Sequence, residues 1–415
     1  MTIYKIFAIT AIIALAITFI TAAIKRPASV AEVLASFLRY FLGAFFIFSG
    51  AVKAVDPLGT AFKMEEYFQV FGQYLPALSG FWEFWAHLAL PVSVFMIVLE
   101  LVLGVALILG TMPTMTLLLY AAIIAFFTFL TGFSAITDKV TDCGCFGDFL
   151  KLKPITSFYK DIILSVLVIV LILWRKYIRL LLNKRISYIA LVVITLASLG
   201  FTMSNYYDLP IVNFRAYKVG TDLLKGKSTE GLDEGDIKTF YSLTKTDTKE
   251  TKEIESKEYT SSGIWRDSTW VIDKSKTRQE VVREPEMPKI KDFIVSDRNE
   301  TDVADSLLSI SGFHLFVTSY SIDKSNPEGY TKINALLANA AKDGIPINGI
   351  CSGNLDKADE LGGGLYKFYT LDATPLKTWM RSNPGLTLME GSTIRGLYHY
   401  NHLPTYEELK KMMKK

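Results

Sequence analysis

The chain of 415 residues is poor in cysteine and in charged residues. Its three cysteines are too few for a fold held by disulfides, and their spacing does not give a tetrahedral zinc set, so the absence of a metal is the favoured expectation. The net charge of +3 is too small and too dispersed for nucleic-acid binding, so we expect no nucleic acid among its partners. Half of the residues are hydrophobic and 20% are charged, which excludes disorder and coiled coil. These exclusions leave a membrane protein with a sizeable soluble part.

Long apolar runs fill the chain up to Tyr206, and none follows Leu209. A membrane helix needs about 20 apolar residues. The sequence therefore predicts six such helices, at roughly 4–24, 33–54, 84–110, 114–135, 156–174 and 186–206. Thr21-Ala22-Ala23 would also fit the cleavage site of a signal peptide, so removal of the first segment stays open.

The basic residues predict the orientation of these helices. Lysine and arginine collect on the cytoplasmic side of membrane proteins. The connection after the fifth helix is the most basic one, with Arg175, Lys176, Arg179, Lys184 and Arg185. The connections 55–83 and 136–155 and both termini then fall outside. We expect a multi-pass protein of the bacterial inner (cytoplasmic) membrane, with the lipid bilayer as a partner and a periplasmic C-terminal half.

The polar C-terminal half has two parts. In the first, Phe240–Leu243 and Trp265–Ile272 are the best strand candidates, and Thr244–Glu255 is expected to be a solvated hairpin tip. The second alternates strands, at 314–318, 345–350, 386–389 and 393–397, with helices at 330–343, 355–361 and 406–413. This order predicts a mixed α/β layer fold.

The second part resembles a thioredoxin fold. The order of its elements is similar, and Arg381–Leu388 resembles the thioredoxin segment with a cis-proline, which makes Pro384 the matching position. Where active thioredoxins carry Cys-x-x-Cys, this chain has no thiol and reads Ser319-Tyr320-Ser321-Ile322-Asp323-Lys324. The resemblance implies a domain that binds or positions another group and does not exchange disulfides by itself.

The membrane half resembles the DoxX family and its relative, the methylamine-utilisation protein MauE. One segment of this chain resembles the first signature of the DoxX family; it reads Arg39…Phe48-Ser49-Gly50…Lys53…Asp56-Pro57…Gly59. A second segment resembles the Cys-x-Cys-Phe-Gly motif of MauE; it reads Thr141-Asp142-Cys143-Gly144-Cys145-Phe146-Gly147-Asp148. The two resemblances cover about residues 33–175, and the whole chain is similar to DoxX-type membrane proteins of Bacteroidota. The likeness to MauE implies maturation of disulfide-rich periplasmic enzymes, beside a separate thioredoxin-like partner.

Together these patterns predict a mainly α membrane helical bundle of about six transmembrane helices. An extracytoplasmic β-rich segment and an α/β thioredoxin-like domain follow it. The predicted boundaries are 1–32 for an N-terminal transmembrane helix, 33–206 for the DoxX/MauE-like bundle, 207–288 for the β-rich segment and 289–415 for the thioredoxin-like domain.

Cys143 and Cys145 are the candidate catalytic pair. They flank Gly144 in a connection that we place outside, where we do not expect them to be buried. The glycine gives the backbone the freedom for a small-ring disulfide, which would be easily reduced. Redox exchange is the favoured interpretation; a structural disulfide and a soft metal such as Cu(I) are the alternatives. Cys351 is expected to be a packed residue, or else the recipient of a disulfide from the pair.

Several charged residues are candidates to support the pair. Lys53, His87 and Lys160 are expected at the outer helix ends near the depth of Cys143, where a cation would lower the pKa of the thiol. The alternatives are a local Lys160–Asp161 pair and, for His87, a place in the aromatic belt of the membrane surface.

Glu100 is expected deep inside the third helix, where a carboxylate needs a partner. Arg39, in the second helix, is predicted to be that partner. The alternative for Glu100 is a quinone or proton site.

The favoured function is an inner-membrane thiol–disulfide or electron-transfer component that supports the maturation of envelope proteins. It would make the chain an oxidoreductase, with a quinone as candidate cofactor and a periplasmic client or thioredoxin-like protein as partner. The alternative is a non-catalytic, membrane-anchored assembly factor that binds its client through the surface around Ser319–Lys324. Replacing Cys143 by serine should abolish the first function and spare the second.

Overall fold

The computed structural model describes residues 2–140, 142–233, 235–283 and 285–414, so Thr141 of the cysteine motif lies outside the described residues. Six described helices are long and apolar enough to cross a membrane. They are α1 (Ile3–Lys25), α2 (Val30–Val55), α5 (Ala89–Leu109), α6 (Pro113–Thr137), α7 (Pro154–Leu173) and α8 (Lys184–Tyr207). They confirm the six predicted segments and make the chain a multi-pass membrane protein.

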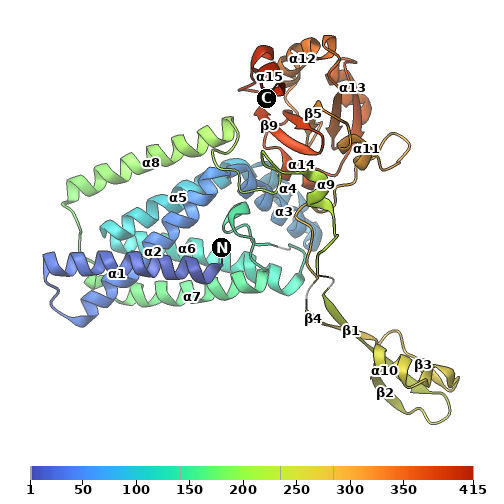
Figure 1. Cartoon of the computed structure of the whole chain (residues 1–415). Coiled ribbons are helices and arrows are strands. Elements are labelled where there is room, and N and C mark those ends of the chain that lie inside the picture. The colour runs from blue at the N-terminus through green and yellow to red at the C-terminus, as the bar shows by residue number, and fades with distance from the viewer. Residues whose placement is uncertain (1, 141, 234, 284, 415) are drawn as a thin grey trace.

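The close packing of α2 against α5 forms the centre of the bundle (Figure 1). Gly43 and Gly104 face each other there: a Cβ on either would lie 2.8 Å from the other's carbonyl oxygen. Small residues allow two membrane helices to approach this closely. The helix α8 packs mainly on α5 and is the least buried of the six.

Two helices between α2 and α5 were missing from the prediction. They are α3 (Pro57–Tyr74) and α4 (Ser79–His87). Asp56 follows α2, and its side chain accepts a hydrogen bond from the backbone N–H of Gly59 at 3.0 Å. Pro57 is the first residue of α3. An aspartate cap before a proline is a favourable helix start, so a new helix begins directly after α2.

The first sheet of the C-terminal half is entirely antiparallel and forms an arm that projects from the rest of the chain (Figure 1). The central strand β1 (Asp236–Lys245) pairs with β2 (Thr251–Glu255), β3 (Trp270–Ile272) and β4 (Arg278–Arg283). The short helices α9 (Leu223–Lys227) and α10 (Ser256–Ser261) lie before and within it. The predicted strand at Phe240–Leu243 is confirmed. In contrast, Trp265–Ile272 is a strand only in its last three residues, because a turn of 3₁₀ helix occupies Ile264–Arg266.

The second sheet has the order β7-β6-β5-β8-β9. Its strands are β5 (Phe313–Ser319), β6 (Ile347–Cys351), β7 (Lys367–Thr370), β8 (Gly385–Glu390) and β9 (Thr393–His399). β5, β6 and β7 are parallel, whereas β8 and β9 are antiparallel to their neighbours. The helices are α11 (Ala304–Leu308), α12 (Pro327–Lys342), α13 (Leu355–Gly362), α14 (Ala373–Trp379) and α15 (Tyr406–Met413).

This arrangement confirms the predicted mixture of strands and helices, to which it adds β7, α11 and α14. The peptide bond between Asn383 and Pro384, just before β8, is cis. The thioredoxin-like assignment and the predicted domain boundaries stay predictions.

Candidate functional site

Cys143 and Cys145 lie in the connection between α6 and α7, and both are buried, with exposed fractions of 8% and 4%. Both are free thiols. The expectation that they would not be buried is wrong because Phe146, the next residue, packs its ring against Phe45 and Phe48 of α2 and holds the loop inside the bundle. Among the described residues, no three His, Cys, Asp or Glu side chains gather as a metal site would require.

The two thiols have different surroundings. The sulfur of Cys143 accepts hydrogen bonds from Ser157 Oγ at 2.9 Å and from the backbone N–H of Cys145 at 3.4 Å. The pKa of Cys143 is lowered to about 7, first by the hydrogen bond from the Cys145 thiol and then by the positive charge of Lys160, which together outweigh burial. The same hydrogen bond and burial raise the pKa of Cys145. Of the two thiols, Cys143 is therefore the one that ionises more readily.

The predicted Lys160–Asp161 pair is present and lies next to the cysteines. Lys160 Nζ is 2.5 Å from Asp161 Oδ1, and Thr131 Oγ1 donates to Asp161 Oδ2 at 3.0 Å. The ammonium of Lys160 is 5.6 Å from the centre of the Phe146 ring. Lys160 thus belongs to a buried local pair and also contributes positive charge at the cysteine loop.

The predicted Arg39–Glu100 pair is wrong. Glu100 pairs with Lys53, whose Nζ is 2.5 Å from Glu100 Oε1. Arg39 donates instead to the carbonyl of Arg179 at 2.6 Å and to the hydroxyl of Tyr40 at 2.7 Å. The prediction began the third membrane helix at residue 84, whereas α5 begins at Ala89. At 1.5 Å per residue, this moves Glu100 by roughly 7 Å toward the end of α2 that carries Lys53.

Ser49 connects this ion pair to the cysteine loop. Its hydroxyl is 3.2 Å from Glu100 Oε2 and 3.2 Å from the carbonyl oxygen of Cys145. Lys53 and Glu100 are nearly inaccessible to solvent, with side-chain exposures of 2% and 1%. A buried ion pair of this kind tolerates the loss of neither partner.

Two further predicted residues lie apart from this cluster. His87 is exposed at the end of α4 and makes none of the described contacts to the cysteines. Cys351 is fully buried in β6, where burial raises the pKa of its thiol to about 12. It is therefore packed, as expected.

Lys63 of α3, which the sequence did not single out, covers the cysteine loop. A Cβ on Gly144 would lie 2.9 Å from Lys63 Cγ, and Gly144 has a φ of +63°. The Lys63 ammonium pairs with Glu66 at 2.8 Å and with Asp142 at 3.0 Å. Gly144 therefore supplies both the backbone conformation and the space that the lysine stem needs.

Replacing Lys63 by alanine should speed alkylation of Cys143 by a small thiol reagent, because it removes the side chain that covers the loop. Peptide mass spectrometry would give the rate at Cys143 separately. Lys151→Ala is the matched control, because Lys151 lies exposed in the connection that carries the cysteines and its ammonium pairs with Asp148. Equal rates in the Lys63 variant and the parent would show that the thiol is reached by another route.

The alkylation rate of Cys143 should rise with pH and reach half of its maximum near pH 7, where half of the thiol is ionised. One pH unit lower, about a tenth of the thiol is ionised, so the rate should be about a tenth of its maximum. Cys145, whose pKa is raised, should react only at higher pH. The pH profile of labelling at each site tests this, and a midpoint for Cys143 near that of an ordinary thiol would contradict it.

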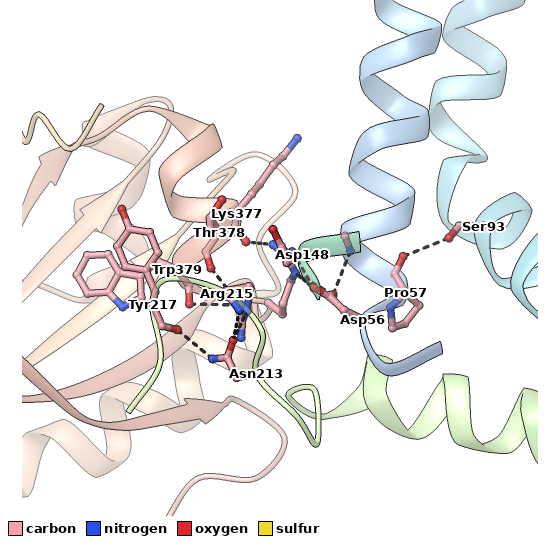
Figure 2. A network of polar contacts seen from close by, with 12 residues as sticks. Asp56, Pro57, Ser93, Asp148, Asn213, Arg215, Tyr217, Lys377, Thr378 and Trp379 are labelled. Atoms are coloured by element: carbon pink, nitrogen blue, oxygen red, sulfur yellow. Dashed lines mark hydrogen bonds and ion pairs between the residues drawn. The ribbon is translucent and has the colours of Figure 1, made fainter. Parts of the chain in front are cut away.

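A second cluster joins the cysteine loop to the C-terminal half. Arg381 binds Asp56 through Nε, at 2.9 and 3.0 Å, and through Nη2, at 2.8 Å, and it also binds Asp148 at 2.9 Å. Figure 2 shows Asp56 and Asp148 between the helices of the bundle and Arg215 of the C-terminal half. Burial alone would raise the pKa of Asp56, but the charge of Arg381 and its hydrogen bonds hold that pKa below its usual value. Since Asp148 closes the cysteine motif, Arg381 connects that motif to the segment before β8.

The segment Ser319–Lys324, predicted to stand where active thioredoxins carry Cys-x-x-Cys, packs on α3. The ring centre of Tyr320 is 5.3 Å from that of Phe62, and Lys324 pairs with Glu65 at 3.0 Å. Lys377 pairs with the same carboxylate at 3.1 Å. The surface around Ser319–Lys324 is therefore partly occupied by the chain's own helix α3.

Comparison with known proteins finds one similarity, and it includes the cysteine motif. Residues 31–175 match the family model described as methylamine utilisation protein MauE. No curated protein matches the chain, and no solved structure matches it. The match runs from α2 to α7 and includes Lys53, Glu100, both loop cysteines and Lys160. The chain is thus a multi-pass membrane protein whose residues 31–175 are similar to the methylamine utilisation protein MauE.

Proposed function

We propose that this protein exchanges thiols and disulfides in the maturation of envelope proteins, with Cys143 as the attacking thiolate and Cys145 as the second thiol. The observation that carries the proposal is the difference between the two sulfurs. Cys143 has a lowered pKa, a hydrogen bond from Ser157 and the charge of Lys160, whereas Cys145 retains its proton beside it. A reactive thiolate next to a protonated thiol is the arrangement that disulfide exchange requires.

The exchange has two steps. The Cys143 thiolate attacks a disulfide of a client protein; a bond forms between Cys143 and one client sulfur, and the other client sulfur leaves as a thiolate. Cys145 then loses its proton and attacks Cys143, which releases the second client sulfur. The client is reduced by two electrons and the Cys143–Cys145 pair is oxidised to a disulfide. A dithiol on a partner protein, such as a thioredoxin-like one, reverses these steps and restores the thiols.

The C-terminal half positions the cysteine loop in this proposal. The order of the strands in the second sheet supports a thioredoxin-like domain. It has no cysteine at the end of β5, and it binds the cysteine motif through Arg381 and Asp148. We place it on the periplasmic side of the inner membrane, because the basic connection after α7 lies at the opposite end of the bundle.

Trapping the mixed disulfide tests the function. In membranes from cells that express Cys145→Ser, the first step can occur but the second cannot. We expect a client to accumulate on Cys143 as an adduct of higher mass that a reducing agent releases. The Cys143→Ser/Cys145→Ser double variant should give no adduct, and Cys351→Ser/Cys145→Ser should give as much as Cys145→Ser alone. Absence of an adduct from every variant would refute exchange by this pair.

The docking of Arg381 on Asp56 and Asp148, together with the missing Cys-x-x-Cys, favours a second candidate, a non-catalytic assembly factor. In that case client maturation should be unchanged by Cys143→Ser and lost when the Arg381 contact is broken. The first function requires the opposite result for Cys143→Ser.

A further inference from the structure

A cationic cavity lies at the end of the bundle opposite the cysteine loop, where α1 ends and α2 begins. The charged residues of its wall are Lys25, Glu32, Arg39 and Arg179, so three cations face one anion. The enclosed part has a volume of about 30 Å³. Since one water molecule needs roughly 10–15 Å³, this part admits about two or three atoms of that size. It therefore suits a small anionic group and not a whole metabolite.

Arg39 is buried in this wall without a counterion. It is 4% exposed, and its guanidinium donates to two neutral oxygens, the carbonyl of Arg179 at 2.6 Å and the hydroxyl of Tyr40 at 2.7 Å. Its Nε is a buried donor without a hydrogen-bond partner among the described residues. Charged side chains in membrane helices generally pair with one another or mark a binding site. The guanidinium thus lacks both a hydrogen-bond acceptor and a negative charge.

Lys25 of α1 approaches the same stretch of chain as Arg39. Its ammonium donates to the carbonyl of Leu180 at 2.5 Å, and Arg39 donates to the carbonyl of the residue before it. Among the described residues, neither cation contacts a carboxylate. Glu32, the carboxylate of the described cavity wall, is paired with Arg179 at 2.9 Å. Two cations without a counterion therefore converge from two helices on consecutive carbonyls.

The surroundings of the cavity favour a lipid as the source of the missing charge. Beside the charged residues, α1 and α2 expose apolar side chains on the outside of the bundle, among them Ile20, Ile24, Val30 and Leu34. Basic pockets between membrane helices bind anionic lipid headgroups. In a phospholipid, acyl chains that contact the exposed apolar residues are joined to a phosphate that can reach the cations.

We propose that this cavity binds the phosphate group of an anionic phospholipid, held by the charges of Arg39 and Lys25. Ser36 lines the cavity three residues before Arg39, on the same face of α2, and its hydroxyl makes no hydrogen bond to the other described residues. It supplies a further donor to the phosphate. The lipid must carry net negative charge, because a zwitterionic headgroup would bring a cation of its own to a site with an excess of two.

Such a lipid would join three segments of the bundle. Lys25 belongs to α1, Arg39 belongs to α2, and the carbonyls to which they donate belong to the connection after α7. Since α1 is one of the least buried membrane helices, its attachment should gain most from the added contacts. Binding of the lipid should therefore stabilise the bundle against heat. This site is independent of the proposed thiol exchange and goes beyond it.

Thermal unfolding of the purified full-length chain in phosphatidylcholine nanodiscs, with increasing shares of phosphatidylglycerol, tests the proposal. We expect phosphatidylglycerol to raise Tm in a saturable way. At a concentration of 100 times its Kd, it should shift the unfolding equilibrium about 100-fold toward the folded state. Arg39→Gln should abolish this rise. Lys25→Gln removes an exposed cation of the site and should weaken binding about fivefold, the effect of one cation near a lipid surface.

Arg26→Gln is the matched control. Arg26 is the next residue, is exposed, carries the same charge and does not line the cavity, so its variant should bind phosphatidylglycerol like the parent. If Arg39→Gln does not fold, the comparison of Lys25→Gln with Arg26→Gln decides the question. Equal weakening in these two variants would indicate attraction to the basic surface in general and would overturn the site.

Two further results would also overturn the proposal. One is an equal Tm in nanodiscs with and without phosphatidylglycerol. The other is a rise in Tm that inorganic phosphate produces in pure phosphatidylcholine and that phosphatidylglycerol does not, because the site would then hold a free anion. Neither result concerns the cysteine loop, so failure of the lipid site and failure of the proposed function are distinguishable.

Discussion

Replacing Arg381 by leucine is expected to cost about 3–5 kcal/mol of stability at the junction between the bundle and the C-terminal half. The guanidinium is 4% exposed and binds both Asp56 and Asp148, so its loss leaves Asp56 without its cation in a buried site and leaves Asp148 paired with Lys151 alone. We expect the second sheet to detach from the bundle and residues 208–235 to become sensitive to protease. Limited proteolysis and thermal unfolding of the purified protein in detergent would measure both effects.

Arg298→Gln is the matched control for this prediction. Arg298 also binds two carboxylates, those of Asp356 and Asp359, but it does so at the exposed surface, where ion pairs contribute little. Its variant should unfold and be digested like the parent. If the two arginine variants unfold and are digested alike, the buried ion pairs of Arg381 do not hold the bundle and the C-terminal half together.

Replacing Lys53 by methionine should destabilise the bundle itself by about 3–5 kcal/mol, because it leaves Glu100 as an unpaired charge inside the membrane-spanning part. Thermal unfolding in detergent, followed by tryptophan fluorescence, measures the effect. The double variant Lys53→Met/Glu100→Gln removes both charges and should recover most of the loss. A double variant as unstable as Lys53→Met would indicate that the loss comes from packing and not from the charge.

The membrane helices could be predicted from the sequence because a membrane helix has a simple physical requirement. About 20 consecutive apolar residues are needed to cross the bilayer, and the six runs that meet this length match the six described helices that are long and apolar enough to cross. The helix α3 could not be found in this way because it does not cross. Its buried residues Met64, Tyr67, Phe68 and Phe71 lie on one face at spacings of three and four, and this pattern was a usable signal.

The cysteine pair could also be found, because Cys-Gly-Cys is a local motif, but its surroundings could not. The covering Lys63, the Ser157 hydrogen bond and the Arg381 contact come from α3, α7 and the segment before β8. Contacts between residues so far apart in sequence depend on the final packing. The same limit explains why Glu100 was paired with Arg39: a depth counted from residue 84 was wrong by more than a helical turn.

The reduction potential of the Cys143–Cys145 pair tests the central claim most directly. The full-length protein in membranes would be equilibrated in thiol–disulfide buffers of defined potential. Differential alkylation and mass spectrometry would then give the fraction of each cysteine in the reduced form, with the buried Cys351 as an internal reference. We predict that Cys143 and Cys145 titrate together, reversibly and as a two-electron couple. Thiols, or a disulfide, that stay in one state over the whole range of potentials would contradict exchange and leave the loop as a structural element.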